Sequence, residues 1–536
     1  MPYLHPSLRA LILCLGISAA ALVRSATCQR LDLRDRTPVA EREYEDASSR
    51  QLAGWLAEFG HKGNFLTSSL VEDYSERVGK VAAKTTGRGE RALEARLLLL
   101  EAAGWKLTEY DAPGVASTIR ELAQAELVER LKPGRGNGFF DWLMEEVTPH
   151  PDRYGLEVRV VNLFALNARM DMRSSASPEV EQILVALMMS GRDPEPLVRS
   201  TALDFLAERT DPFVSDYFLG ELERGKIAPE TFTDHLRRLE ANSSQASKTW
   251  WERRGARVQT YVRSGLEAED WRRTSMALAV APELETASIV PFLIQGLGVW
   301  DARTRVGGRL RVISEYAEAL GRLTGLDYGM RADTWARWWQ AETADGTYPA
   351  TPTTEERATF FGLAPRSDRV LFIIDRSGSM RQSYQSSPSR YAAAVEALVY
   401  TLRDLGPDAR FQVVLFAMQA ERFRPDLTRA TPENLELLED WATRRGVGGG
   451  TDLRAGFDAA FPGLESGEMA ATDIPFDSVY VLCDGETGSP AWVAPWLLEH
   501  NVQARLTFHC VNLGGTPAGA LEALATGSGG AFVRHE

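Results

Sequence analysis

Cysteine is scarce in this chain. Only four cysteines occur among 536 residues. Small exported domains that depend on disulfides are dense in cysteine, so the sequence excludes a disulfide framework. Cys483 and Cys510 fall in two apolar runs that we expect to be neighbouring strands. Two alternatives stay open for this pair: one disulfide, or two buried thiols that pack as small hydrophobic side chains.

Catalytic motifs are missing as well. The chain has no His-Glu-x-x-His, Gly-x-Ser-x-Gly or Gly-x-x-x-x-Gly-Lys-Ser/Thr sequence, which are signatures of zinc proteases, serine hydrolases and P-loop nucleotide binders. The seven histidines are scattered, and His509 lies inside a predicted strand, where we expect a buried core residue. Ser377 and Ser379 have no adjacent base that would activate a nucleophile. We therefore expect a protein that is not an enzyme.

Basic residues are outnumbered, and long apolar runs are absent beyond the amino terminus. The chain has 60 Lys and Arg against 74 Asp and Glu, a formal net charge of -14. Phosphate contacts require clustered Lys and Arg, so this balance argues against a general nucleic-acid binder. No stretch after residue 28 approaches the roughly 20 apolar residues that a membrane helix needs. With 44% hydrophobic residues, the length allows several domain cores.

The amino terminus has the features of an export signal. Arg9 precedes an apolar segment, residues 10–23, which is short for a bilayer span but has the size of a signal-peptide core. We expect residues 1–28 to be a signal peptide and the protein to be exported, whether periplasmic, at the cell surface or secreted. The alternatives are an uncleaved amino-terminal anchor and a lipid attached to Cys28.

Residues 29–170 are expected to form a helical region of unknown role. Residues 92–100 and 116–131 have apolar side chains at helical spacing. An earlier stripe with the same spacing ends before Gly60 and consists of Leu52, Trp55, Leu56 and Phe59.

Prolines at regular intervals mark residues 171–343. Pro178, Pro194, Pro212 and Pro229 are separated by 16, 18 and 17 residues, and the first three follow Ser or Asp. A proline after a capping residue is a helix start signal, so we expect two short helices per roughly 34 residues. This pattern resembles HEAT-like repeats, and the resemblance implies an all-α solenoid. A plain helical bundle is the alternative.

Two segments add to the helical prediction. The first predicted repeat helix has an apolar stripe formed by Val180, Ile183, Leu184 and Leu187. Residues 323–339, with Trp335, Trp338 and Trp339, resemble the end of a helix pair in bacterial HEAT-like proteins, so a bacterial origin is expected. We expect these tryptophans to pack in a core or at its end. Residues 344–365 are then predicted to be a linker, because Gly, Pro and Thr gather there.

The most informative segment follows this linker. Residues 370–374 form an apolar run that is typical of a strand buried on both faces of a parallel sheet. Asp375, Ser377 and Ser379 come directly after it. Ligands bind at the carboxyl ends of such strands, and these three side chains alternate so that they can converge on one point. Carboxylate and hydroxyl oxygens suit Mg²⁺ or Mn²⁺.

Two later segments add ligands of the same kind. Residues 448–450 are three glycines followed by Thr451 and Asp452. Residues 479–483 form a second apolar run, which ends at Asp484. Together the three segments resemble the von Willebrand factor type A (VWA) domain and its metal-ion-dependent adhesion site. The resemblance covers residues 366–536 and implies a doubly wound, Rossmann-like α/β domain.

The resemblance also implies the ligands of one divalent cation, Mg²⁺ or Mn²⁺. Carried over residue by residue, they are Asp375, Ser377, Ser379, Thr451 and Asp484. Thr451 and Asp484 can act through water. The chain departs from the family at Cys483, where Thr is frequent, and by a polar insertion at residues 383–389 near the expected metal face.

These observations give the fold class and two functional hypotheses. We expect a multidomain chain in which an all-α, HEAT-like region precedes a VWA domain. In the first hypothesis the protein is an exported adhesion protein whose cation bridges to an Asp or Glu of a protein partner, because Mg²⁺ keeps exchangeable water ligands that a carboxylate can replace. In the second, the helical region is a scaffold that binds the partner and the VWA domain is structural.

Overall fold

The computed structural model describes most of the chain beyond the amino terminus. The described residues are 68–85, 90–104, 113–132, 138–173, 177–303, 307–344, 359–363, 365, 367–484, 487, 492–514 and 518–535. The predicted signal peptide, the stripe before Gly60 and most of the predicted linker lie outside them. The chain divides into two compact units, with the boundary between Arg209 and Thr210. Each unit is described by itself.

The described residues of the first unit are helical. Two of its helices confirm the apolar spacing seen in the sequence, at residues 90–104 and 113–131. The short helix Gly138–Trp142 continues directly into one π-helical turn, Leu143–Val147. The helices are α3 (Ser68–Lys84), α4 (Glu90–Gly104), α5 (Pro113–Leu131), α6 (Gly138–Trp142), α7 (Leu156–Asp171), α8 (Pro178–Ser190) and α9 (Pro196–Ala207).

The proline signals predicted most helix starts correctly and one wrongly. Helix α8 begins at Pro178 and its predicted apolar stripe is buried. Helix α9 begins at Pro196 rather than Pro194. Asp193 does not cap this helix directly, because its carboxylate accepts a hydrogen bond from the Glu195 N–H (2.8 Å) and pairs with Arg159. This local turn moves the helix start by two residues.

The second unit begins with seven more helices. The predicted starts at Pro212 and Pro229 are confirmed, and the later helices are less regular, because one has 23 residues and another contains Pro291. They are α10 (Pro212–Glu223), α11 (Pro229–Asn242), α12 (Ser244–Leu266), α13 (Trp271–Val280), α14 (Thr286–Asp301), α15 (Arg309–Thr324) and α16 (Ala332–Thr343).

Aromatic side chains anchor α16, as the sequence predicted. Trp335 and Trp338 are buried. The Trp335 indole N–H donates to the Gly329 carbonyl at 2.9 Å, and its ring meets that of Tyr328 edge-to-face at 4.9 Å. Buried indoles normally satisfy their N–H in this way.

A twisted sheet of seven strands forms the centre of the carboxyl-terminal domain within the described residues. Its order is β3-β2-β1-β5-β6-β7, and β4 also pairs with β2. Strands β1, β2, β5, β6 and β7 are parallel, whereas β3 and β4 run antiparallel to β2. The strands are β1 (Arg369–Asp375), β2 (Arg410–Phe416), β3 (Ala420–Arg422), β4 (Thr428–Arg429), β5 (Ser478–Cys483), β6 (Thr507–Asn512) and β7 (Phe532–Arg534).

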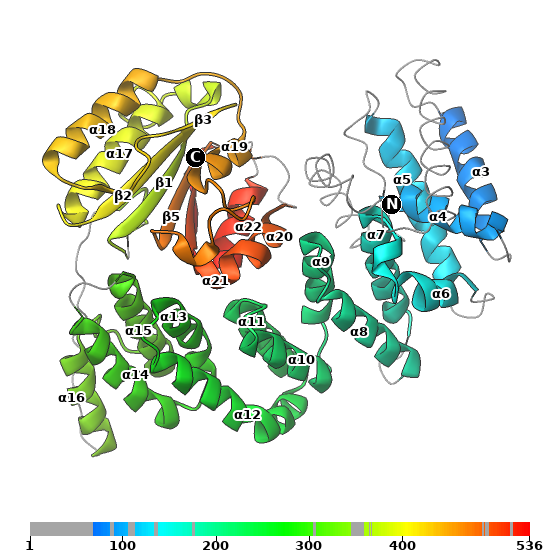
Figure 1. Ribbon diagram of the computed structural model, residues 1–536, viewed down its shortest axis with the longest axis horizontal. Helices are drawn as coiled ribbons and strands as arrows, with labels where there is room; N and C mark the ends of the chain where they lie inside the picture. Colours follow the sequence, from blue (N-terminus) through cyan, green and yellow to red (C-terminus); the bar gives the residue numbers. More distant parts are fainter. Residues whose placement is uncertain are drawn as a thin grey trace. The chain divides into compact units, whose positions relative to one another are not determined.

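Helices cover both faces of this sheet (Figure 1). Side chains of β1 alternate between the two cores: Phe372 and Ile374 face α17 (Arg390–Leu405) and α18 (Pro432–Arg445), and Leu371 and Ile373 face the other layer. That layer contains α19 (Leu453–Ala460), α20 (Val493–Trp496), α21 (Val502–Ala504) and α22 (Gly519–Ser528). The predicted fold class is therefore confirmed: a helical region followed by a doubly wound α/β domain.

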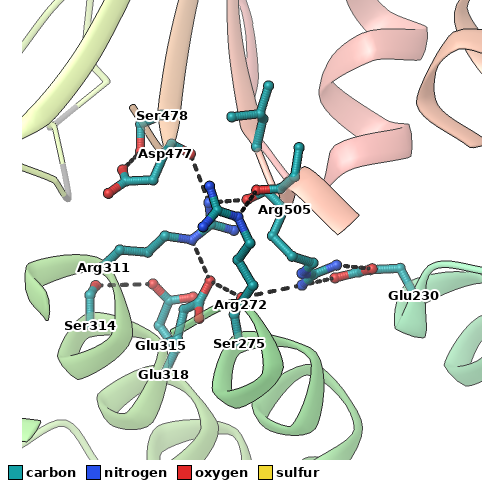
Figure 2. Close-up of polar contacts among 12 residues, drawn as sticks. Glu230, Arg272, Ser275, Arg311, Ser314, Glu315, Glu318, Asp477, Ser478 and Arg505 are labelled. Carbon is teal, nitrogen blue, oxygen red and sulfur yellow. Dashed lines mark hydrogen bonds and ion pairs between the residues drawn. The ribbon is translucent and has the colours of Figure 1, made fainter. Parts of the chain in front are cut away.

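Helices α11, α13 and α15 pack against the amino ends of β5 and β6 through arginines (Figure 2). Arg311 donates to the Asp477 carbonyl at 2.7 Å and to the Arg505 carbonyl. Arg272 donates to the carbonyls of Ile474 and Ala504 at 3.1 and 3.3 Å. The edge of the sheet opposite to the predicted metal site is thus joined to the helices.

The structure decides the cysteine alternative. Cys483 lies on β5 and Cys510 on β6, which are adjacent parallel strands, and both are buried thiols that form no disulfide. The prediction of neighbouring strands is confirmed, and so is the thiol alternative. His509 is buried and stacks on Tyr480 at 5.0 Å, as expected for a core residue. Within the described residues no helix combines the length and apolar composition needed to cross a bilayer.

Candidate metal centre

Asp375 lies at the centre of the candidate site. It is the last residue of β1, and its partner across the ladder is Phe416 of β2. Its side chain is fully buried, and one carboxylate oxygen accepts a hydrogen bond from the Ser377 N–H at 2.6 Å. Burial raises the pKa of the Asp375 carboxyl, and the charge of Asp484 acts in the same direction. A nearby cation would favour the ionised form.

The two serines connect Asp375 to Asp484. The Ser377 and Ser379 hydroxyl oxygens are 3.0 Å apart, and the Ser379 hydroxyl donates to Oδ1 of Asp484 at 2.9 Å. Ser377 is 1% exposed, whereas Ser379 is exposed to solvent. Ser377 is the N-cap of the short 3-10 helix Gly378–Arg381, which contains Ser379. The site is therefore closed at Asp375 and open at Ser379.

Asp484 follows β5, the strand adjacent to β1. Because parallel neighbouring strands end at the same edge, the two carboxylates meet there. Asp375, Cys483 and Asp484 each offer one ligand atom, and these three atoms lie within 4.8 Å of one another. Residues 485 and 486 lie outside the described part of the chain.

The glycine loop lies against the first motif. The Gly378 N–H donates to the Gly449 carbonyl at 2.9 Å, and the Gly448 N–H donates to the Arg376 carbonyl at 2.8 Å. Thr451 follows this loop, but in the described residues its side chain makes no hydrogen bond to the other four predicted ligands. The structure therefore brings four of the five predicted ligands together, with Thr451 on the adjoining loop.

Cys483 is also part of the site. Its thiol donates to Oδ2 of Asp375 at 3.0 Å. A thiol is a weak donor, and the Thr that is frequent at this position in the VWA family also offers a donor hydrogen. Cys483 therefore replaces the frequent Thr and still provides a hydrogen-bond donor to the Asp375 carboxylate.

Arg390 is a residue of this site that the sequence did not predict. It begins α17, directly after the polar insertion, and its guanidinium lies 3.2 Å from Oδ2 of Asp484. The backbone N–H of Arg390 also donates to the Gln382 carbonyl at 2.7 Å, across the insertion. The only available signal was a base at the end of an insertion near the expected metal face. Arg390 neutralises one of the two buried carboxylates.

The donor set fits a hard divalent cation. Two carboxylates within one buried site repel each other unless a proton, a base or a cation compensates for their charge. Arg390 supplies one positive charge, and the carboxylate and hydroxyl oxygens are the ligand type of Mg²⁺ and Mn²⁺. The thiol of Cys483 is engaged as a donor, so the set offers oxygen rather than sulfur.

Comparisons with known proteins agree with the fold of this domain. A family model described as the von Willebrand factor type A domain matches residues 368–533. Human inter-alpha-trypsin inhibitor heavy chain H4 is 30% identical over 183 residues, which are 33% of this chain and 19% of that protein. The mouse heavy chain 4 is 31% identical over 143 residues, 26% of this chain and 14% of that protein.

A related heavy chain, H1 of Mesocricetus auratus, is 29% identical over 126 residues, 23% of this chain and 13% of that protein. The chain thus spans less than a fifth of the length of each of these relatives. The likeness is to one part of them. Residues 368–533 are a von Willebrand factor type A domain, which in this chain follows a helical region.

Proposed function

We propose that this protein is a binding protein, not an enzyme, whose VWA domain holds one divalent cation and uses it to bind an acidic residue of a protein partner. The convergence of Asp375, Ser377, Ser379 and Asp484 at one edge of the sheet is the observation that carries this proposal. Thr451, on the loop that contacts Gly378, completes the proposed ligand set.

The residues divide into two roles. Asp375 and the serine hydroxyls would contact the cation, whereas Asp484 and Thr451 can act through water. Once bound, Mg²⁺ or Mn²⁺ supplies a positive charge with exchangeable water ligands that a partner's carboxylate can replace. The exposed Ser379 marks the side from which the partner can approach.

The relatives support a role in protein contact but do not name a partner. They are called heavy chains of an inhibitor, a name that describes one component of an assembly. The export signal predicted from the sequence of residues 1–28 supports a site of action outside the cytoplasm, which we propose to be the periplasm, the cell surface or the medium of a bacterium.

A calorimetric titration of Mg²⁺ and Mn²⁺ tests the metal proposal. We expect one ion per wild-type chain and no binding to Asp375→Ala. Asp458→Ala is the matched control, because Asp458 is an exposed carboxylate of α19, and it should bind like the wild type. Circular dichroism should show the same helix content in all three proteins. Equal binding by wild type and Asp375→Ala would remove Asp375 from the site.

The contacts at the amino-terminal ends of β5 and β6, which we call the amino edge of the sheet, favour a second candidate function. The opposite ends of the parallel strands, where Asp375 and Asp484 lie, are the carboxyl edge. Because Arg311 and Arg505 join the VWA domain to α11, α13 and α15, the domain can act as the structural end of a helical scaffold that binds the partner itself. Chelation separates the candidates. In EDTA the metal-bridged partner should dissociate, whereas a partner bound by the helices should remain.

A further inference from the structure

One exposed apolar side chain beside the proposed metal centre has no role in holding the cation. Met418 comes two residues after Phe416, which pairs with Asp375 across the ladder, so it lies at the same edge of the sheet. Its exposed fraction is 58%. An isolated exposed apolar residue is ordinary on a protein surface. Its position at a ligand-binding edge is what makes Met418 informative.

Met418 lies against the exposed part of the glycine loop. A Cβ atom added to Gly450 would be 3.0 Å from the Met418 sulfur, and one added to Gly449 would be 3.5 Å from the Ala417 Cβ. Gly449 and Gly450 are both exposed. Since the Gly449 carbonyl accepts the Gly378 N–H, contacts run from Met418 through this loop to the segment between Ser377 and Ser379.

The other side of the site is polar. The insertion forms a tight turn in which Tyr384 and Ser387 pair, and the Tyr384 ring is buried next to Phe361. Ser383, Gln385 and Ser386 remain exposed. The proposed metal centre thus has hydroxyl and amide groups on one side and a methionine with bare glycine backbone on the other.

The acidic residue of β3, the strand that begins two residues after Met418, is paired within the protein. Glu421 on β3 lies 2.6 Å from the Arg445 guanidinium and 4.0 Å from that of Arg376. Glu421 is thus paired within the protein, so β3 presents no unpaired carboxylate that would repel the partner's acidic residue. Met418, two residues before β3, offers an exposed apolar contact.

We propose that Met418, Gly449 and Gly450 form a recognition surface for an apolar side chain next to the partner's Asp or Glu. The inference rests on the proposed metal-bridged contact and adds the class of sequence that is bound. Consecutive Cα atoms are about 3.8 Å apart, so a residue beside the bound carboxylate is within reach of this surface. Methionine is unbranched and polarisable, and therefore adapts to different apolar side chains.

A displayed library of seven-residue peptides with a fixed central Asp tests this surface. The full chain is immobilised in Mn²⁺, and bound peptides are released with EDTA and sequenced. The targets are wild type, Met418→Ser, Met418→Leu and the control Leu437→Ser, which changes an apolar residue of α18 that is 45% exposed. None of these changes alters charge, so calorimetry should give the same Mn²⁺ affinity for all four.

We expect apolar residues to be enriched beside the Asp on wild type, Met418→Leu and Leu437→Ser, and not on Met418→Ser. A synthetic peptide from the enriched set should bind Met418→Ser about tenfold more weakly, the loss expected when a methionine contact is removed. The proposed recognition surface would be overturned if wild type and Met418→Ser selected the same residues beside the Asp. It would also be overturned if the chain bound Mn²⁺ but EDTA released no peptide, and that second result would still be consistent with the proposed metal centre. Absence of Mn²⁺ binding would overturn the metal-bridged contact and this inference together.

Discussion

The two edges of the sheet in the second unit differ in how their polar groups are matched. At the amino edge, arginines of the helices donate to backbone carbonyls of the VWA domain, and Arg505 of the domain pairs with Glu230 of α11 through two contacts of 2.9 Å (Figure 2). At the carboxyl edge, the carboxylates of Asp375 and Asp484 meet, and the Arg390 guanidinium pairs with Asp484. Most polar groups of the first edge are matched by protein groups, whereas Asp375 at the second has no ion-pair partner among the described residues.

This difference has a physical consequence. Polar groups removed from water need partners, and unpaired buried carboxylates are costly. The amino edge obtains its partners from within the chain, which fixes the helices on the domain. At the carboxyl edge Asp375 lacks an ion-pair partner among the described residues, and we propose that a bound cation supplies it. In this proposal the same fold provides a fixed contact at one edge and a site for exchange at the other.

Replacement of Arg311 should have the largest effect on the matched edge. Arg311 is 5% exposed and donates to two backbone carbonyls and to Glu315 at 2.8 Å. Arg311→Ala leaves these acceptors buried without their donor, so we expect a loss of about 3 kcal/mol in the free energy of unfolding. Urea denaturation followed by circular dichroism measures it.

The control for this change is Arg337→Ala. Arg337 pairs with Asp333 on α16 at 2.9 Å, but their side chains are 60% and 72% exposed, and such surface pairs contribute about 0.5 kcal/mol or less. Equal losses in the two variants would contradict the view that the amino edge is a matched, buried contact.

Neutralising Glu230 should lower the free energy of unfolding by less than Arg311→Ala does, and the loss should depend on pH. Burial disfavours the charged form, but the charge and hydrogen bonds of Arg505 outweigh it and hold the pKa of Glu230 below its usual value. The stabilisation is therefore complete above the unfolded pKa of about 4.3 and is lost as pH falls through the folded pKa. Glu230→Gln should lower the free energy of unfolding by about 1 to 2 kcal/mol at pH 7, because Arg505 loses its charged partner.

Urea denaturation of wild type and Glu230→Gln at pH 7 and in acid checks this dependence. Glu240→Gln is the control, since Glu240 is an exposed residue of the same helix. A stability difference between wild type and Glu230→Gln that stays constant down to the lowest pH at which the chain remains folded would show that the pair contributes through packing rather than through charge.

The sequence predicted the carboxyl edge better than the amino edge, for a local reason. Asp375 and Asp484 each follow an apolar run that is recognisable as a buried strand, and parallel strands bring their ends together. The fold class and four of the converging residues could therefore be predicted from short segments. The error at Pro194 had a local cause too, since Asp193 stabilises a turn before α9.

The amino edge depends on pairs that no local pattern marks. Arg311 and Arg505 are 194 residues apart, and Glu230 and Arg505 are 275 apart. Arg505 also has a left-handed backbone with φ of 56°, which a non-glycine residue rarely adopts. In a sequence with 60 basic residues, nothing distinguishes the arginines of this contact from those on exposed helix faces. Arg390 was missed for the same reason.

Asp477 gives the smallest expected effect in this comparison. It is a buried carboxyl at the amino edge, and only one of its two oxygens accepts a hydrogen bond in the part of the chain that the structure describes. The Ser478 hydroxyl donates to its Oδ1 at 3.0 Å, whereas Oδ2 has no hydrogen-bond partner within the described residues. Burial raises the pKa of Asp477, and the charge of Arg311 opposes this shift only in part. The folded chain therefore binds this proton more tightly than the unfolded chain does.

The sign of the pH dependence follows from that difference. The contribution of Asp477 to the free energy of unfolding should fall as pH rises from the unfolded pKa of about 3.9 through the raised folded value, and above it the deficit is constant. Asp477→Asn, which carries no charge, should be the more stable protein at pH 8, and its advantage should shrink in acid. Urea denaturation at both pH values measures this, with Asp473→Asn as the exposed control. If Asp477→Asn is less stable than wild type at pH 8, the Asp477 charge contributes favourably to the contact with Arg311, and the amino edge is matched at every carboxylate.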